Sequence, residues 1–338
     1  MESRNQRSRI MIIIGIWFLL LLLMLSCGST PVGTSEPVAT APGSYLNLKI
    51  VYTNLDMINS TGRELGFVTQ DGLSMISFAI DPGYEDFYNI WQYPLISNDG
   101  KILFVTFTSV PGTGGEIIAL PAGEIPIQCG WQGLLRLAQD GLHVWVNTGI
   151  EIDEYHITDC GTENPHKVIY RDVESGLDAL SPDKRYIAVV LGGERGIEEH
   201  IVVRDLETGE ERDLGNGNFP VWSRDGDWLA FTGTDGIYVF QNNPDTLPIR
   251  LISMENVGPN VGAPVYQYDQ YNGYFPPIAS WSPDGQWIVY HVCLEMESVD
   301  GGGWVKHYSI IKTNVETGET VELADNGVSP FWRWSAQP

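Results

Sequence analysis

A short Asp-containing turn recurs five times along the chain, and this repeat constrains the fold more than any other feature. The copies read ISNDG at 96–100, LAQDG at 137–141, LSPDK at 180–184, WSRDG at 222–226 and WSPDG at 281–285. An apolar segment follows each copy within two residues. In such turns the Asp side chain bonds to its own backbone, and Gly adopts a positive φ. The repeat therefore predicts a series of similar β-hairpins.

The spacing of the repeat predicts propeller blades. Successive turn Asp residues lie 41, 43, 42 and 59 positions apart. In the clearest copies a third strand, a Thr-Gly turn within ETGE (207–210 and 316–319) and a fourth strand follow. Four short strands in roughly 42 residues are the signature of a propeller blade.

The two ends of the repeat region supply a sixth blade. Strands are expected within 46–80, where no SPDG-like turn precedes them, and the segment FWRWS at 331–335 matches the strand before that turn. This match puts Trp334 in the register of Trp222 and Trp281, which we expect to pack between blades. We expect an all-β fold: a six-bladed β-propeller of four-stranded antiparallel blades over 46–338. The C-terminal strand completes blade 1, which leaves no unpaired edge.

The repeat resembles the TolB-like six-bladed β-propeller family, which includes the propellers of dipeptidyl- and prolyl-peptidases. The resemblance spans 46–335 and is carried by SPDG at 282–285, SPDK at 181–184 and the two ETGE segments. Asp99, Asp140 and Asp225 lie in degenerate, WD-like copies. The resemblance implies the fold. The peptidases also carry an α/β-hydrolase domain, but no GxSxG elbow occurs here, and a shared fold does not transfer activity.

Residues 1–26 have the pattern of a bacterial lipoprotein signal peptide. Three Arg precede an uninterrupted run of 16 apolar or Gly residues at 10–25, and Ser26 and Cys27 follow. This order is typical of secretion signals, and a membrane-spanning helix needs about 20 apolar residues. Cys27 directly after a small residue resembles a lipobox, which predicts lipidation at Cys27. A retained membrane anchor and ordinary secretion are the alternatives.

Residues 27–45 are expected to be a flexible tether, because they are mostly Gly, Ser, Thr, Pro, Ala and Val without apolar periodicity. The propeller would then lie outside the cytoplasm at the cell membrane or envelope, anchored through the lipid on Cys27. With 43 acidic against 19 basic side chains, the formal net charge is −24. Nucleic-acid binding depends on Lys and Arg, so no nucleic acid is expected among the partners.

The long connections fall on one face of the predicted propeller. The SPDG and Thr-Gly turns on the opposite face are short, whereas segments such as 294–305 and those between blades are long. Two of the connections are rich in aromatic residues and form the candidate binding face: Tyr84, Phe87, Tyr88, Trp91, Tyr266, Tyr268, Tyr271, Tyr274 and Phe275. Tyr and Trp suit partner surfaces and sugar rings. The alternative is that these rings fold inward as small cores of their own loops.

No pattern in the chain predicts catalysis. The six His belong to no nucleophile motif, and there is no P-loop, dinucleotide fingerprint or zinc spacing. The repeated turn Asp residues are expected to cap their own backbone. Glu295, Glu297 and Asp300 could bind Ca²⁺ through oxygen ligands, but solvated loop charge is the favoured interpretation. We expect no catalytic residue, no metal and no cofactor.

Cys129 and Cys160 lie 31 positions apart, and an oxidising location favours a bridge between them. The expected strands, however, place the two residues near opposite faces, roughly 15 Å apart, whereas bridged Cα atoms lie within about 7 Å of each other. The bridge is therefore not favoured, and its presence stays open. Cys293, at a strand end, is expected to be a small buried hydrophobe.

These features together predict a non-catalytic binding or scaffolding propeller for protein, peptide or glycan partners. One alternative is an envelope hydrolase, processing carbohydrate or peptide, with its site at the channel mouth. Another is a structural or sensor subunit. An apolar aromatic shelf at the channel mouth would favour binding, whereas converging polar groups with His or paired acids would favour an enzyme.

Overall fold

The computed structural model describes residues 49–54, 64–68, 75–79, 90–108, 116–121, 127–162, 166–192, 199–233, 235–243, 245–253, 279–299, 303–325 and 327–333. The predicted signal peptide 1–26, the tether 27–45 and Cys27 lie outside these residues. Among the described residues, strands are the regular elements, and no helix is long and apolar enough to cross a membrane.

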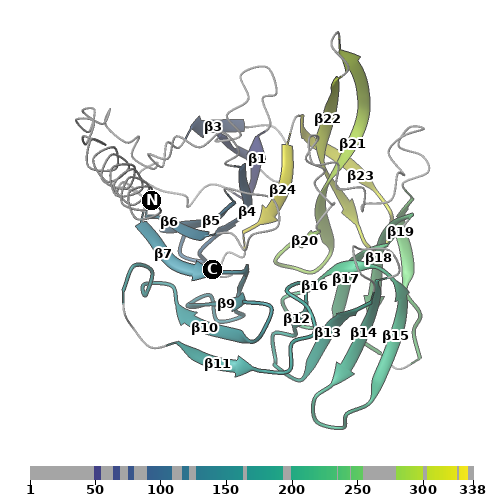
Figure 1. Cartoon of the computed structure of the whole chain (residues 1–338). Helices are drawn as coiled ribbons and strands as arrows, with labels where there is room; N and C mark the ends of the chain where they lie inside the picture. The colour runs from purple at the N-terminus through teal and green to yellow at the C-terminus, as the bar shows by residue number, and fades with distance from the viewer. Residues whose placement is uncertain are drawn as a thin grey trace, which may run out of the picture. The chain divides into compact units, whose positions relative to one another are not determined.

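The described strands form six four-stranded antiparallel sheets (Figure 1), here named A to F. Sheet A, in spatial order, comprises β24 (Gly327–Trp332), β1 (Ile50–Asn54), β2 (Glu64–Val68) and β3 (Met75–Ala79). Sheets B and C comprise β4 (Ile90–Ile96), β5 (Ile102–Thr108), β6 (Glu116–Pro121) and β7 (Ile127–Gln132), then β8 (Leu134–Leu137), β9 (His143–Asn147), β10 (Ile152–His156) and β11 (Lys167–Tyr170). Sheets D and E comprise β12 (Ala179–Leu180), β13 (Tyr186–Leu191), β14 (His200–Asp205) and β15 (Glu211–Asn216), then β16 (Asn218–Trp222), β17 (Trp228–Gly233), β18 (Gly236–Gln241) and β19 (Ile249–Ser253). Sheet F comprises β20 (Ser280–Trp281), β21 (Trp287–Val299), β22 (Gly303–Asn314) and β23 (Thr320–Asp325). The fold is an all-β propeller of four-stranded antiparallel blades.

The repeated turn joins the first two strands of sheets B to F, and its Asp caps the backbone as predicted. In four copies the Asp also accepts a hydrogen bond of 2.5–2.7 Å from the Ser two positions before it. That Ser hydroxyl in turn accepts the N–H of the second strand's first residue, as from Tyr186 to Ser181 at 2.8 Å. Burial opposes ionisation of Asp99, but the hydrogen bonds from Ser97 and Lys101 lower its pKa overall. Four of the five turns are thus closed by a Ser–Asp pair, and in the turn at 137–141 Ala138 takes the position of the Ser.

Lys184 takes the position that Gly occupies in the other copies of the turn. Its φ is 63°, close to the 65–80° of Gly100, Gly141, Gly226 and Gly285. This left-handed backbone is strained for a side chain with a Cβ. The Lys184 ammonium lies 2.8 Å from Glu154 and over the Trp145 ring, so it connects sheet D to sheet C. The contact of Lys184 with sheet C therefore offsets the backbone strain at this position.

Strand β24 forms the edge of sheet A beside β1. Ile50 is paired with Trp332, and the N–H of Arg333 donates to Lys49 at 2.8 Å. The same backbone bond follows Trp222 and Trp281 in their sheets, from Ser223 and Ser282. Trp332, not Trp334, therefore occupies the repeat position. The predicted register was wrong by two residues, because the Trp-Ser pair at 334–335 imitates the Trp-Ser of the other copies.

Apolar clusters fill the space between consecutive sheets from B to F, and one joins F to A. The repeat-position Trp residues take part in this packing, as predicted, and also bond across it. The indole N–H of Trp222 donates to Ala179 in sheet D at 2.9 Å, and that of Trp281 to Val221 in sheet E at 2.9 Å. Trp222 is 4% exposed and Trp281 1%. Each indole therefore joins its strand to the first strand of the preceding sheet.

Cys129 and Cys160 form a disulfide, with their Cα atoms 4.2 Å apart. The expectation that they lie near opposite faces was wrong. Cys129 is the third residue of β7, near the end where that strand begins, and Cys160 lies in the turn that follows β10. The first residues of β7 and the turn that follows β10 thus lie beside each other, and the bridge connects sheets B and C.

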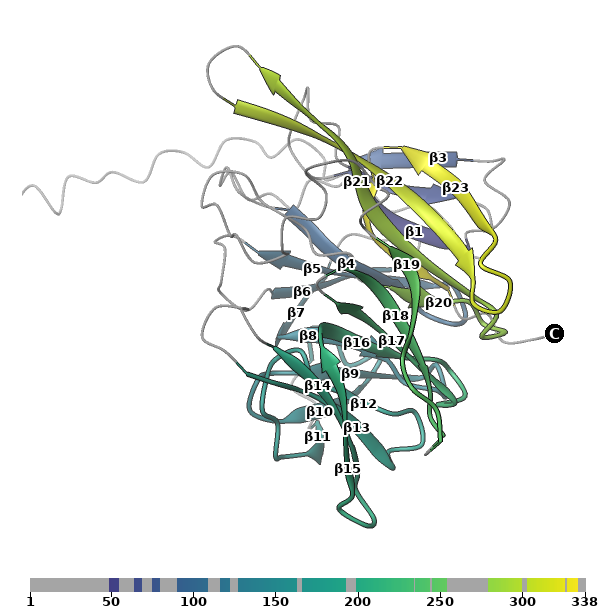
Figure 2. The same cartoon turned by 90° about the vertical axis from the view of Figure 1, so that its right-hand side faces the viewer.

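The segment 294–305, expected as a loop insertion, continues two strands. β21 and β22 extend to Val299 and from Gly303, and their hairpin projects beyond the neighbouring strands (Figure 2). Glu295 and Glu297 are paired with His307 and Val305 within this ladder. The two acids therefore lie in a strand and not in the flexible acidic loop considered for Ca²⁺, while Asp300 lies outside the described residues.

Candidate functional site

A cavity opens where the first strands of the six sheets meet. Figure 1 shows β24, β12, β16 and β20 on the inner side of their sheets. The space bounded by its lining is about 820 Å³ with the part open to solvent included, and the interior available to a water-sized molecule is about 80 Å³. Its lining residues are Pro94, Leu95, Leu135, Arg136, Leu137, Trp145, Ala179, Leu180, Pro182, Val221, Trp222, Ala279, Ser280, Trp281, Pro330 and Phe331.

The lining is mostly apolar and aromatic. Three Trp and one Phe contribute rings, and the described lining contains no carboxylate and no His. The indole N–H groups of Trp222 and Trp281 are already bonded to backbone oxygens, and that of Trp145 donates to Glu154 at 2.9 Å. The rings therefore offer the cavity apolar surface rather than hydrogen-bond donors.

Two polar side chains reach the lining. The Ser280 hydroxyl accepts the N–H of Trp332 at 2.9 Å, and Arg136 donates from Nη1 to Leu135 at 3.2 Å. Ser280 thus has a structural partner, and no described His lies in the lining to activate it as a nucleophile. Arg136 is the only charged residue of the described lining, which makes a carboxylate the ligand group that this wall can recognise.

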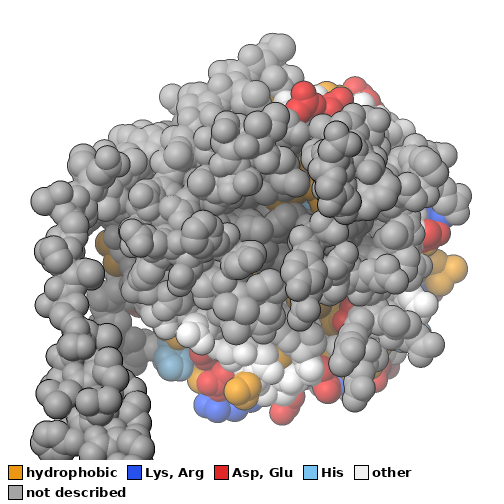
Figure 3. Space-filling model, turned by 45° about the horizontal axis from the view of Figure 1, so that its top comes forward, with side chains coloured by type: hydrophobic (Ala, Val, Ile, Leu, Met, Phe, Trp, Pro, Cys, Tyr) orange, Lys and Arg blue, Asp and Glu red, His pale blue; other side chains and the backbone are white. Residues whose placement is uncertain are grey.

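The exposed described surface is more polar than this cavity. Acidic side chains of the described residues lie at several separate places around the edge of the face shown in Figure 3, in keeping with the acidic composition of the chain.

The sequence-predicted binding face falls mainly outside the described residues. This applies to Tyr84, Phe87, Tyr88, Tyr266, Tyr268, Tyr271, Tyr274 and Phe275. Trp91 is described as the second residue of β4, with its backbone paired to Phe107. The same strand reaches the cavity through Pro94 and Leu95. The aromatic face stays a prediction.

Sequence reasoning did not predict the cavity. It assigned Trp222, Trp281 and Phe331 only to the repeated strands. Leu135 and Arg136 belong to no motif, because the repeat is strongest in the turn that follows each first strand. The position of these residues in the repeat could have identified them, because the residues just before the repeated turn lie on the innermost strand of each blade. That rule would have gathered Trp222, Trp281 and their neighbours at one place.

The fold and cavity define the class of protein as a β-propeller. No family model and no curated protein matches the chain. A chain of the nidogen/laminin complex is similar in structure, with a TM-score of 0.51 and 11% identity over 85% of this chain and 99% of that one. That similarity supports the propeller fold and nothing further.

Other solved propeller structures give lower scores. A putative TolB from Agrobacterium tumefaciens is similar with a TM-score of 0.47 and 13% identity, over 84% of this chain and 91% of that one. An oligogalacturonate lyase in complex with manganese is similar with a TM-score of 0.42 and 14% identity, over 85% of this chain and 75% of that one.

Proposed function

We propose that the chain is an extracytoplasmic, lipid-anchored lipoprotein whose propeller is a non-catalytic binding module for a protein, peptide or glycan partner. The observation that carries the proposal is the chemistry of the cavity. Its described lining is apolar and aromatic, with Arg136 as the only charge and without the paired acids or His that hydrolysis requires.

The module is proposed as a closed ring of six blades. Three observations support this: six four-stranded sheets, apolar clusters between consecutive sheets, and the pairing of β24 with β1. On the remaining side, β4 of sheet B contacts β1 and β24 of sheet A. Arg333 strengthens that side, because its Nη2 donates to Asn98 in the first turn of sheet B at 2.7 Å.

The cavity best suits an extended peptide that carries an apolar or aromatic side chain beside a carboxylate. The Trp rings and Phe331 would contact the apolar side chain, and Arg136 would pair with the acid. A hydrolase is less well supported, because the hydroxyl of Ser280 already accepts a backbone N–H.

A crosslinked pull-down from intact membranes tests the binding proposal. Val221→Trp fills the cavity, and Arg136→Glu reverses its charge; either change is expected to lower recovery of the crosslinked partner at least about tenfold. Leu142→Trp is the matched control, since Leu142 is 53% exposed and is not a lining residue. Unchanged recovery from correctly folded Val221→Trp and Arg136→Glu would refute the assignment of the partner to this cavity.

The anchor is tested separately. Cys27→Ser is expected to release the chain from the membrane fraction, and mass spectrometry of the wild-type N-terminus should show acylated Cys27. An unprocessed N-terminus in the wild type would instead favour a retained membrane anchor.

A further inference from the structure

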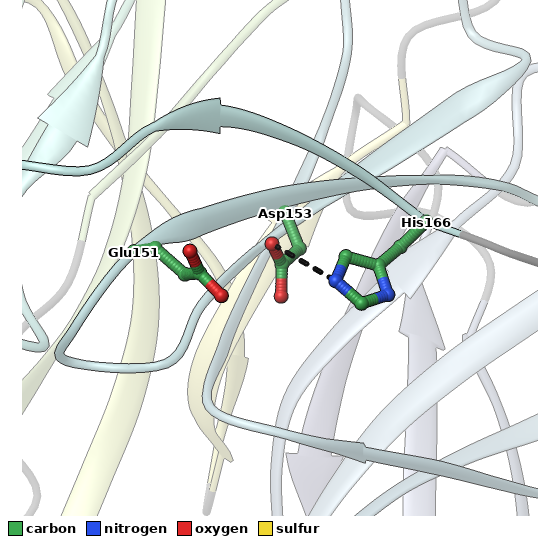
Figure 4. Close-up of side chains that lie close together, drawn as sticks. All are labelled: Glu151, Asp153 and His166. Carbon is green, nitrogen blue, oxygen red and sulfur yellow. Dashed lines mark ion pairs between the residues drawn. The ribbon is translucent and has the colours of Figure 1, made fainter.

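Glu151, Asp153 and His166 converge on one face of sheet C (Figure 4). Glu151 directly precedes β10 and Asp153 is its second residue, so the two side chains leave the same face. His166 directly precedes β11, the neighbouring strand. The three candidate ligand atoms lie within 4.8 Å of one another, and His166 Nε2 is 3.6 Å from Asp153 Oδ1.

This face is turned toward sheet B and is covered by aromatic rings. Tyr155, two residues after Asp153, stacks on Trp131 of β7 with ring centroids 4.4 Å apart. The His166 ring lies 5.3 Å from Tyr155. Buried Asp153 is therefore placed beside an apolar wall, where charge is poorly solvated, while Glu151 is partly exposed and His166 is exposed.

Asp153 is the unusual member of the cluster. The residue is 4% exposed, and its buried Oδ1 accepts no hydrogen bond from the described residues. Burial raises the pKa of Asp153, against the effect of the nearby His166. A buried carboxylate oxygen without a hydrogen bond is costly and calls for a compensating cation.

The neighbouring basic residues form ion pairs with carboxylates other than Asp153. Arg171 Nη1 lies 3.1 Å from Glu151 Oε2, and Lys167 lies 3.8 Å from Glu154 on the opposite face of β10. Arg171 thus fixes one oxygen of Glu151, and a carboxylate has a second oxygen with which to ligate. His166 supplies a nitrogen donor in addition to the two acids.

We propose that Glu151, Asp153 and His166 bind a divalent transition-metal ion, with Zn²⁺ the best fit. One imidazole and two carboxylates form a mixed nitrogen and oxygen set that suits Zn²⁺ better than Mg²⁺ or Ca²⁺. Tetrahedral Zn²⁺ with bonds of about 2.1 Å places its ligands roughly 3.4 Å apart. The 3.6 Å separation of His166 and Asp153 is close to this value. Rotation of the longer Glu151 side chain would bring its carboxylate oxygen, now within 4.8 Å of the other two ligand atoms, to the same ion.

Three protein ligands leave the fourth position of the ion for water or for a group from a partner. The ion would also clamp the start of β10 to the start of β11, because the ligands come from both strands. The site is distinct from the cavity: none of its three ligands is among the cavity lining.

The test uses the purified full-length protein, first stripped of metal with a chelator. Titration calorimetry with Zn²⁺ is expected to show one site tighter than about 10 μM. Zn²⁺ at about 100 times its Kd should raise the Tm by roughly 5 °C. Co²⁺ bound in place of Zn²⁺ should give visible absorption of a tetrahedral centre.

Two variants assign the site. Asp153→Asn and His166→Gln are each expected to weaken Zn²⁺ binding at least about tenfold and to abolish the Co²⁺ absorption. The control is His143→Gln, which removes another His beside a carboxylate, since His143 Nδ1 lies 2.7 Å from Asp140. This control should leave both readouts unchanged.

The Tm of Asp153→Asn, measured without and with Zn²⁺, tests the site even if a variant folds poorly. Without metal, Asp153→Asn is expected to melt at or above the wild-type Tm, because it removes a buried charge of similar volume. With Zn²⁺, only the wild type should gain stability. The proposal is overturned if the wild type shows no site tighter than about 10 μM, or if Asp153→Asn and His166→Gln bind Zn²⁺ as the wild type does. In that case the cluster is a metal-free ion pair of His166 with Asp153.

Discussion

The disulfide between Cys129 and Cys160 supports a quantitative prediction about stability. The bridge closes a loop with a sequence separation of 31 and joins sheet B to sheet C. Chain-entropy theory gives a stabilisation of about 3.7 kcal/mol for a loop of this length, because the cross-link restricts the unfolded chain. Removing the bridge should therefore cost roughly 3–4 kcal/mol.

The assay is equilibrium unfolding in urea, followed by Trp fluorescence. The double variant Cys129→Ala/Cys160→Ala is compared with the wild type in the absence and presence of reductant. With an m-value near 3 kcal/mol/M, the midpoint should fall by about 1 M urea. Reduced wild type serves as the control, because it loses the cross-link but keeps both buried sulfurs.

Two possible results distinguish loss of the cross-link from loss of sulfur packing as the cause of the lower stability. If reduced wild type and the double variant lose the same stability, the cross-link itself is responsible, as predicted. If reduction costs less than about 1 kcal/mol while the double variant loses more, packing of the sulfurs dominates and the loop-entropy reasoning is refuted.

Three further predictions follow from single contacts. Trp222→Phe should cost about 1–3 kcal/mol in urea unfolding, because it leaves the buried carbonyl of Ala179 without its indole donor; a neutral effect would contradict this role. Burial opposes ionisation of Glu154, but the hydrogen bond from Lys184 contributes to a pKa below the ordinary value of 4.5. This stabilisation is present above pH 4.5 and is lost as the pH falls through the lower pKa of the folded state. Glu154→Gln should therefore flatten the dependence of Tm on pH in that window. Parallel curves of Tm against pH for the variant and the wild type would refute this role. Gly133→Ala places a Cβ against the backbone oxygen of Asn147 at φ +138°, and should lower stability by more than about 2 kcal/mol in the same urea assay; a smaller loss would show that the backbone yields there.

Much of the fold could be predicted from the sequence because the repeated turn is a local structure. Asp183 and Asp225 bond within a few residues of themselves, so their spacing alone predicts hairpins and blades. The register of the last strand could not be settled in this way. Trp332 is defined by its pairing with Ile50, a contact far along the chain, whereas the local Trp-Ser match pointed to Trp334.

The candidate sites were harder to predict for the same reason. The disulfide depends on the start of β7 lying beside the turn after β10 in the neighbouring sheet, which strand lengths in the sequence do not encode. Asp153 and His166 are brought together by the pairing of β10 with β11 across an intervening segment. Neither shows a metal-binding spacing in the sequence, and burial of Asp153 becomes visible only in three dimensions.

The pairing of β24 with β1 also bears on the order of folding. Sheets B to F assemble from strands that follow one another closely, whereas sheet A joins Ile50 to Trp332, residues 282 positions apart. Contacts of high sequence separation form slowly, since the entropy of closing a long loop opposes them until they are made. Sheet A is therefore expected to form late, and until it does β1 presents an open edge to proteases and to other chains.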